Sequence, residues 1–171
     1  MNELFQISDD ASFLGLINTD LYESFISEDW EFEDIENRII RECKNGHLLF
    51  WGTSVPNLWT VRICDQASDQ KAFQSFQGKI KVSQSKLHLI NYESITLAAH
   101  FEDEKLPNSD IEALYVPLEN GIYNVNVRQL FDPEKDLIED ESLGFELVLQ
   151  KSVENAAFPV NPFKELIWSN Y

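Results

Sequence analysis

After residue 46 the sequence repeatedly alternates apolar and polar residues, and this period of two constrains the fold more than any other feature. In "LWTVRIC", for example, Trp59, Val61 and Ile63 fall on one side of an extended chain and Arg62 on the other. Because successive side chains of a strand point to opposite faces, such a segment predicts a strand with one apolar face. The pattern recurs in "FQGKIKVS", "KLHLINY", "GIYNVNVRQL" and "GFELVLQKSV". Two-faced strands are typical of antiparallel sheets, so we expect a mainly β protein, an antiparallel β-sandwich or barrel.

Further strands are predicted where the alternation is weaker. "LFQIS" and "HLLFWGT" predict short strands, and "SITLAAHF" and "IEALYVPL" predict two more. The run "FLGLI" at 13–17 fits a strand or a helix. Pro56-Asn57 and the stretch 119–121 carry turn residues of the kind that join the strands of a hairpin.

One amphipathic helix is expected near residues 29–44. Its apolar residues follow the spacing of a single helical face: Phe32, Ile35, Ile39, Ile40 and Cys43. Acidic residues crowd the first turns and basic residues the last, as the helix dipole favours. Ser27 or Asp29 is expected to be the N-cap. Asp34 and Arg38 are spaced to form an ion pair along the helix.

A chain of 171 residues is long enough to bury a core of its own. We expect a single domain over residues 1–171, with the core sandwich at about 47–153 and a tail at 154–171 that forms a short helix or an added strand. Cys43 and Cys64 lie in apolar surroundings, so buried thiols are favoured over a disulfide. The sequence shows neither a signal-peptide pattern nor an apolar run of membrane-spanning length, so the expected location is cytoplasmic.

The charge of the chain excludes two classes of partner. With 13 basic and 30 acidic residues the formal charge is −17, and the pI is about 4.4. A strongly negative surface repels nucleic acid and anionic membranes, so we expect neither as a partner. Three clusters carry much of the acidic charge, at 28–36, 102–104 and 132–141. This charge favours cations or a basic protein partner.

The sequence lacks the motifs that would indicate an enzyme or a cofactor site. Its histidines, His47, His88 and His100, have no metal-binding spacing. It contains no GxSxG, no GxGxxG and no P-loop, and its acidic clusters lack the glycine of an EF-hand loop. We therefore expect no catalytic residue, no metal and no cofactor, in a protein that is not an enzyme.

Between about residues 29 and 127 the chain resembles the competence nuclease inhibitors of the ComJ type and related bacterial immunity-type β domains. The resemblance is carried by "DWEFEDIENRI", "NGHLLFW", "LWTVRIC", "GKIKVSQSKLHLINYES" and "LENGIYNVNV". It implies an all-β inhibitor fold without enzymatic activity that neutralises a nuclease or toxin. The acidic loop 132–142 and the segment that follows it depart from this family pattern.

The leading hypothesis is a non-enzymatic acidic binding protein, an immunity or inhibitor protein that neutralises a basic nuclease-type toxin. Carboxylates on a rigid β scaffold imitate phosphate charges and attract a basic groove. The residues predicted to bind the partner combine acids with one aromatic anchor: Glu28, Asp29, Trp30, Glu31, Glu33 and Asp34. The alternative is a small-molecule-binding barrel or sandwich, with Arg62, His88 or Arg128 converging on an apolar pocket.

Overall fold

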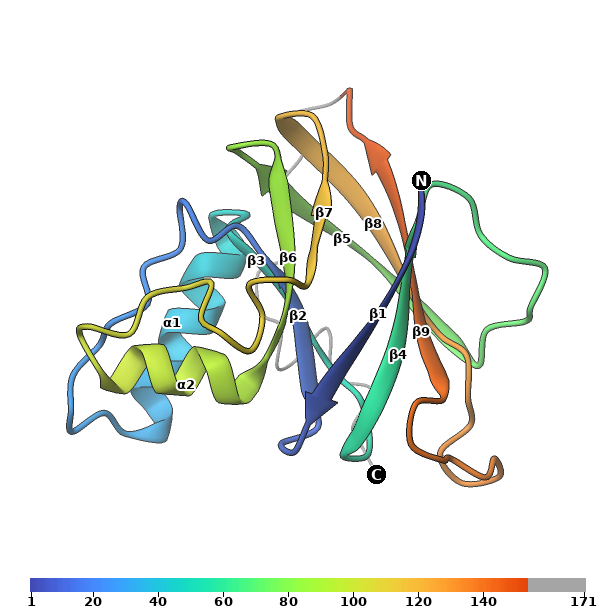
Figure 1. Cartoon of the computed structure of the whole chain (residues 1–171), viewed down its shortest axis with the longest axis horizontal. Helices are drawn as coiled ribbons and strands as arrows, with labels where there is room; N and C mark the ends of the chain where they lie inside the picture. The colour runs from blue at the N-terminus through green and yellow to red at the C-terminus, as the bar shows by residue number, and fades with distance from the viewer. Residues whose placement is uncertain (154–171) are drawn as a thin grey trace.

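The computed structural model describes residues 1–153, which form two β-sheets packed face to face, with two helices on one side (Figure 1). The larger sheet has the order β1-β4-β9-β8-β5 and the smaller one the order β3-β2-β6-β7. The strands of the larger sheet are β1 (Asn2–Asp9), β4 (Asn57–Cys64), β5 (Gln74–Val82), β8 (Gly121–Gln129) and β9 (Leu143–Lys151). The smaller sheet and the helices comprise β2 (Phe13–Ile17), β3 (Leu48–Gly52), β6 (Lys86–Asn91), β7 (Tyr115–Pro117), α1 (Phe32–Lys44) and α2 (Tyr92–His100). The predicted mainly β sandwich is confirmed.

The core between the sheets is built from the apolar faces that the alternation predicts. Trp59, Val61 and Ile63 of β4 are fully buried there, together with the inward residues of β8 and β9. The Trp59 ring meets the Phe145 ring edge to face, with centroids 5.4 Å apart. Gly144 allows this approach, because a Cβ at that position would lie 2.3 Å from the Trp59 ring. Burial of these large side chains is the main contribution to the stability of the sandwich.

A second apolar layer lies between the smaller sheet and the two helices. It contains Ile35 and Ile39 of α1 and Ile95 of α2, packed against Phe50 and Ile90 of the sheet. The smaller sheet is therefore covered on both faces, by the larger sheet and by the helices (Figure 1). This explains why β3 is an uninterrupted apolar run rather than an alternating one.

The strand pairing differs from the prediction in two respects. All pairs are antiparallel except β4 and β9, which run parallel. The turns at Pro56-Asn57 and 119–121 were predicted to join hairpins, and this is wrong, because each connects strands of different sheets. Turn residues reverse the chain, but they do not determine whether the next strand pairs with the previous one or crosses the core.

Several segments differ from their predicted secondary structure. The segment 94–101 was predicted to be a strand, but residues 94–100 belong to α2 and Phe101 is its C-cap; the N-cap Asn91 accepts the Ser94 N–H at 3.0 Å. In "IEALYVPL" only Tyr115–Pro117 is a strand. "FLGLI" is β2, and because β1 and β2 precede residue 47, the sheets begin at Asn2. The predicted tail at 154–171 lies outside the described residues.

The amphipathic helix is present, but its start differs from the prediction. Its N-cap is Glu31 rather than Ser27 or Asp29. Asp34 accepts the backbone N–H of Glu31 at 2.9 Å. The predicted pair of Asp34 with Arg38 is wrong, since Arg38 donates instead to backbone carbonyls of the 23–25 segment.

The cysteines match the prediction of buried thiols: Cys43 and Cys64 are both free and buried. Within residues 1–153, neither helix combines the length and apolar character needed to cross a bilayer.

Candidate functional site

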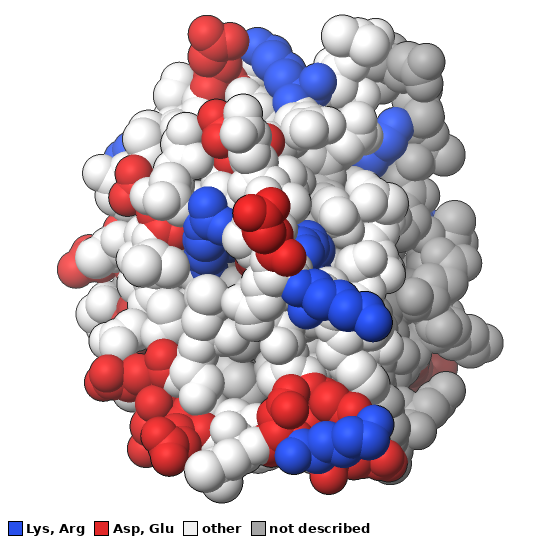
Figure 2. Space-filling view, turned by 90° about the vertical axis from the view of Figure 1, so that its right-hand side faces the viewer, with Lys and Arg blue, Asp and Glu red and all other residues white. Residues whose placement is uncertain are grey.

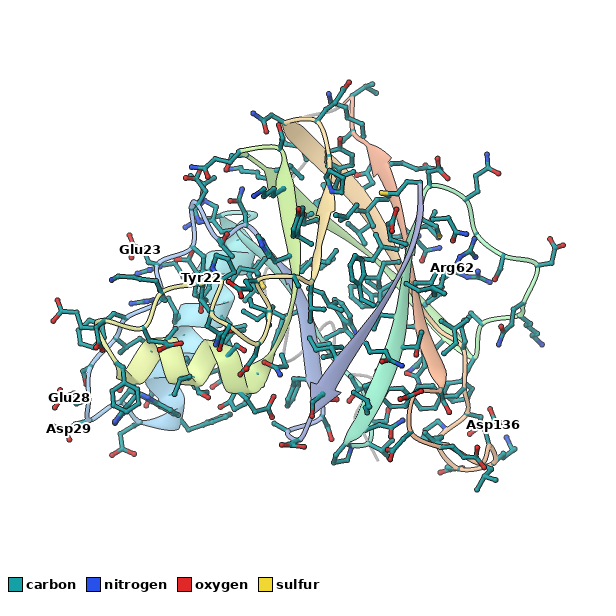
Figure 3. The ribbon with its side chains drawn as sticks, viewed as in Figure 1. Tyr22, Glu23, Glu28, Asp29, Arg62 and Asp136 are labelled. Atoms are coloured by element: carbon teal, nitrogen blue, oxygen red, sulfur yellow. The ribbon has the colours of Figure 1, made fainter. Side chains whose placement is uncertain are left out.

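The acidic residues predicted to bind a partner lie at the end of the molecule that carries the helices. Glu28 and Asp29 project from the loop before α1, beyond both helices (Figure 3). Glu31 and Glu33, at the first turn of α1, are also exposed. None of these four carboxylates is neutralised by an ion pair within the described residues.

The other two predicted binding residues, Trp30 and Asp34, take part in starting the helix, as does Glu31, which is its N-cap. Trp30 precedes the N-cap and packs, partly buried, against the cluster that contains Ile35. This is the arrangement of a hydrophobic staple, in which the residue before the cap contacts the fourth helical residue. Asp34 is exposed, but its carboxylate accepts the Glu31 N–H. The structure thus gives Trp30 and Asp34 a local role at the N-terminus of α1.

A second acidic cluster lies beside the first. The backbone N–H groups of Ile26 and Ser27 donate to the Ala99 carbonyl at 2.9 and 3.2 Å, which fastens the loop before α1 to the end of α2. A hollow of about 590 Å³ lies between them, lined by Glu28, Phe101, Glu102, Asp103 and Lys105. Phe101 is 44% exposed. Residues far apart in the sequence therefore line one hollow, in which three acids lie with an exposed ring and the basic side chain of Lys105.

We call this region the acidic helical end: it comprises Glu28, Phe101, Glu102 and Asp103 of the hollow, together with the exposed acids that follow Glu28 in the chain, Asp29, Glu31 and Glu33. Phe101, Glu102 and Asp103 are not among the binding residues that the sequence predicts. The acidic run at 102–104 is evident in the sequence, but the pattern of the segment before it predicts a strand. The acidic run lies beside Glu28 because the segment before it is the helix α2 rather than a strand.

The third acidic cluster does not join the acidic helical end. Asp136 lies at the opposite end of the molecule from Glu28 and Asp29 (Figure 3). Figure 2 shows the side that carries the outer face of the larger sheet, where acidic residues gather at the lower end, further acidic residues lie at the top, the left edge and the centre, and basic residues lie across the middle and top. The third cluster is thus separate from the acidic helical end.

The basic residues considered for the alternative function do not converge on an apolar pocket. Arg62 and Arg128 both bind the carboxylate of Glu146, which is 0% exposed. Glu146 also accepts the Ser68 N–H at 3.1 Å, and Arg128 donates to the Ser68 carbonyl at 3.3 Å. Burial raises the pKa of Glu146, but hydrogen bonds from Ser68 and the two arginines outweigh it and hold that pKa below its usual value. The network attaches the loop after β4 to the outer face of the larger sheet.

His88 lies elsewhere, on β6 of the smaller sheet. It is 4% exposed, and its ring centroid is 5.5 Å from that of Tyr115. Burial lowers the pKa of His88 to about 4, so the imidazole is neutral at physiological pH. Across residues 1–153, no group of three or more His, Cys, Asp or Glu side chains is arranged to hold a metal ion.

A polar hollow of about 410 Å³ does occur on the outer face of the larger sheet. Five carboxamide side chains contribute to its lining: Gln66, Gln77, Asn124, Asn126 and Gln150. The Oδ1 atom of Asn126 is inaccessible to solvent and has no hydrogen-bond partner within the described chain. A hollow of this size suits a small molecule, and its lining offers both donors and acceptors.

Comparisons with known proteins place the fold but no family. No protein-family model matches the chain. No curated protein matches its sequence. A solved structure described as crocagin biosynthetic gene J is similar, with a TM-score of 0.56 and 14% identity over 88% of this chain and 95% of that one. ComJ from Bacillus subtilis, described as an inhibitor of the DNA-degrading activity of NucA, aligns with a TM-score of 0.48 and 12% identity over 88% of this chain and 96% of its own. ComJ, the type of protein that the sequence resembles, is thus among the structural neighbours, and the chain shares its fold with the crocagin protein.

Proposed function

We propose that this protein is a non-enzymatic binding module that holds a basic protein partner, such as a nuclease-type toxin, at the acidic helical end. The observation that carries the proposal is the joining of two acidic clusters around the exposed Phe101. The class of partner follows from the sequence resemblance to nuclease inhibitors.

Electrostatics supports a basic partner. With a net charge of −17 the whole molecule attracts cations, and the unpaired carboxylates of the acidic helical end orient the encounter. Steering of this kind raises association rates by roughly 10–10³ fold and weakens as salt is added. Phe101 lines the hollow beside these acids and provides an exposed aromatic contact of the kind that interfaces favour.

The rigidity of the acidic helical end supports specific recognition. The loop before α1 is hydrogen-bonded to α2, and Trp30 and Ile35 anchor it to the core beneath. A surface that is already ordered loses little conformational freedom when it binds, which favours affinity.

The experiment compares charge reversal at the two acidic ends of the molecule. The test variant carries Glu28→Lys, Glu102→Lys and Asp103→Lys; the control carries Glu134→Lys, Glu139→Lys and Asp140→Lys, with the same change of net charge. Asp34 is left intact, because its carboxylate accepts the backbone N–H of Glu31, the N-cap of α1. Binding to a panel of purified basic nuclease toxins is measured by biolayer interferometry at several salt concentrations, together with inhibition of DNA cleavage.

We expect the test variant to lose about tenfold or more in association rate, with a weaker salt dependence, while the control keeps most of its binding. Equal losses in the two variants would show that only net charge matters and would contradict a localised site. Binding without inhibition of DNA cleavage would support the proposed interface but contradict the inhibitor function.

The amide-lined hollow favours a second candidate function, the binding of a neutral small molecule on the outer face of the larger sheet. The carboxamide side chains that line the hollow, among them Asn124 and Asn126, offer hydrogen-bond donors and acceptors to such a ligand. A screen of neutral hydrogen-bonding compounds by NMR should shift the resonances of Asn124 and Asn126. Asn126→Leu should abolish those shifts without affecting the acidic helical end, and an empty screen would count against this candidate.

A further inference from the structure

Asp9 is a completely buried carboxyl group at the corner where the chain passes from one sheet to the other. It ends β1 and is 0% exposed. Its Oδ1 accepts the backbone N–H of Phe13 at 2.9 Å. Its Oδ2 lies 2.5 Å from the Thr53 hydroxyl and 3.3 Å from Nε1 of Trp59. The group thus joins β1 and β4 of the larger sheet to β2 and the end of β3 of the smaller one.

Counting hydrogens at Thr53 indicates how Asp9 is protonated. A hydroxyl group donates one hydrogen. Thr53 Oγ1 nevertheless lies within hydrogen-bonding distance of two oxygens, Asp9 Oδ2 at 2.5 Å and the Val55 carbonyl at 3.0 Å. The carbonyl has no hydrogen to give, so each contact has a hydrogen of its own when Asp9 Oδ2 supplies the second one, whereas an ionised Asp9 would have to share the single Thr53 hydrogen with Val55. Asp9 then donates to Thr53, and Thr53 donates to Val55.

The surrounding charges also favour a neutral Asp9. Within the described residues no basic side chain is paired with it. Uncharged donors face Asp9 from β2, from β4 and from the residue after β3, while α2 presents Glu93. Both carboxylate oxygens of Glu93 are inaccessible to solvent and have no hydrogen-bond partner among residues 1–153. An ionised Asp9 would therefore be a buried charge with no cation paired to it and a second carboxyl group nearby, which is unfavourable.

The corner is mechanically connected to α2. Asn91, which caps α2, also donates from Nδ2 to the Ser8 carbonyl at 2.9 Å, next to Asp9. Repulsion between Asp9 and Glu93 would thus act where β1 is fastened to the first turn of α2.

We propose that Asp9 is a neutral carboxylic acid at neutral pH and forms a pH-sensitive joint between the two sheets and α2. When Asp9 loses its proton, it can no longer donate to Thr53, and the contacts that hold the two sheets and α2 together at this point weaken.

The dependence of stability on pH has a definite sign. Burial raises the pKa of Asp9 above its ordinary 3.8, and the charge of Glu93 raises it further. The hydrogen bonds that Asp9 makes lower this pKa, but by less than burial raises it. An unfolded chain loses this proton near pH 3.8, whereas the folded chain keeps it to a higher pH. Stability from this group is therefore present at low pH and is lost as the pH rises through the folded-state pKa.

Two measurements on the full chain test the proposal. The first follows the side-chain carboxyl carbon of Asp9 by ¹³C NMR from pH 4 to pH 9, and the shift at pH 7 should be that of a protonated acid. The second compares urea unfolding of the wild type with Asp9→Asn, which is neutral at every pH. From pH 5 to pH 7 the folded-to-unfolded ratio of the wild type should fall about tenfold per pH unit relative to this variant.

Glu93→Gln provides the matched variant. Removing its charge should move the Asp9 titration to lower pH, and amide hydrogen exchange in the first turn of α2 should become less sensitive to pH. An Asp9 carboxyl shift at pH 7 that is already that of an ionised carboxylate would overturn the proposal, and that measurement holds even if Asp9→Asn does not fold. Parallel pH profiles for wild type and Asp9→Asn would also overturn it.

Discussion

At the scale of single residues, Glu146 shows how a charge is accommodated inside this protein. Its carboxylate is fully buried between two arginines, and it receives the backbone N–H of Ser68 in addition. The alternation of β4 predicts that Arg62 faces away from the core, and it does. Its partner lies 84 residues further along the chain, and no local pattern in the sequence connects the two.

Replacing Glu146 should destabilise the fold, because it leaves Arg62 and Arg128 without their carboxylate partner. We expect Glu146→Gln to lower the free energy of unfolding by about 3–5 kcal/mol at pH 7, as measured by urea denaturation. The pKa of Glu146 is depressed, so its stabilisation is present above about pH 4.5 and is lost as the pH falls through the folded-state value. The variant should therefore approach the wild type in acid. Glu119→Gln, which removes an exposed ion pair with Lys151, is the control and should change little. A Glu146→Gln profile that runs parallel to the wild type would contradict this account.

At the scale of elements, the sequence predicted the strands of the larger sheet better than anything else. Those strands keep one polar face, so their period of two is clear, as in β4 and β8. The segment of α2 is harder to assign, because Ile95, Ala98 and Ala99 are buried in a short helix of nine residues. Its identity depends on Asn91 as a cap and on the apolar layer that it covers. The pairing of β4 with β9 could not be predicted, because register and direction are set by contacts across the whole chain.

The residues of the candidate site were likewise predicted only in part. Four of the predicted acids, Glu28, Asp29, Glu31 and Glu33, are exposed at one end of the molecule, since charge density in a sequence is a good guide to exposure. The aromatic that lines the hollow is Phe101, and the sequence had suggested Trp30 for such a role. A tryptophan directly before an N-cap is better explained as a staple for the helix.

Asn91 is the residue on which α2 most depends. Asn91→Ala removes the cap of the helix and the hydrogen bond to Ser8, so we expect a loss of about 1–2 kcal/mol in the free energy of unfolding. Hydrogen exchange should become faster in α2 first. Asn37→Ala, at an exposed position of α1, serves as the comparison and should leave exchange in α2 unchanged. Uniform acceleration over the whole chain would instead indicate that α2 has no separate stability.

At the scale of the whole molecule, the net charge of −17 has an energetic cost as well as a use. Two acidic ends on one compact body repel each other and their own members. The Debye length shortens from about 30 Å at 0.01 M to about 10 Å at 0.1 M salt, so this repulsion is screened over that range. We expect the urea midpoint to rise as sodium chloride is added. Reversing the charge of Glu134, Glu139 and Asp140 should reduce the rise, and a midpoint that falls with salt would show that attractive ion pairs dominate.

The place of β9 in the larger sheet has a consequence for how the protein is made. It is the last strand of the described chain, yet it lies between β4 and β8. Before β9 has been synthesised, the larger sheet consists of two separate two-stranded ribbons, one of β1 with β4 and one of β5 with β8. Their inner edges are then unpaired. Two-stranded ribbons are marginally stable in water, and open edges accept foreign strands. The larger sheet is therefore completed only after β9 has been synthesised, and chains that end before β9 lack the strand that joins its two halves, although they contain every strand of the smaller sheet.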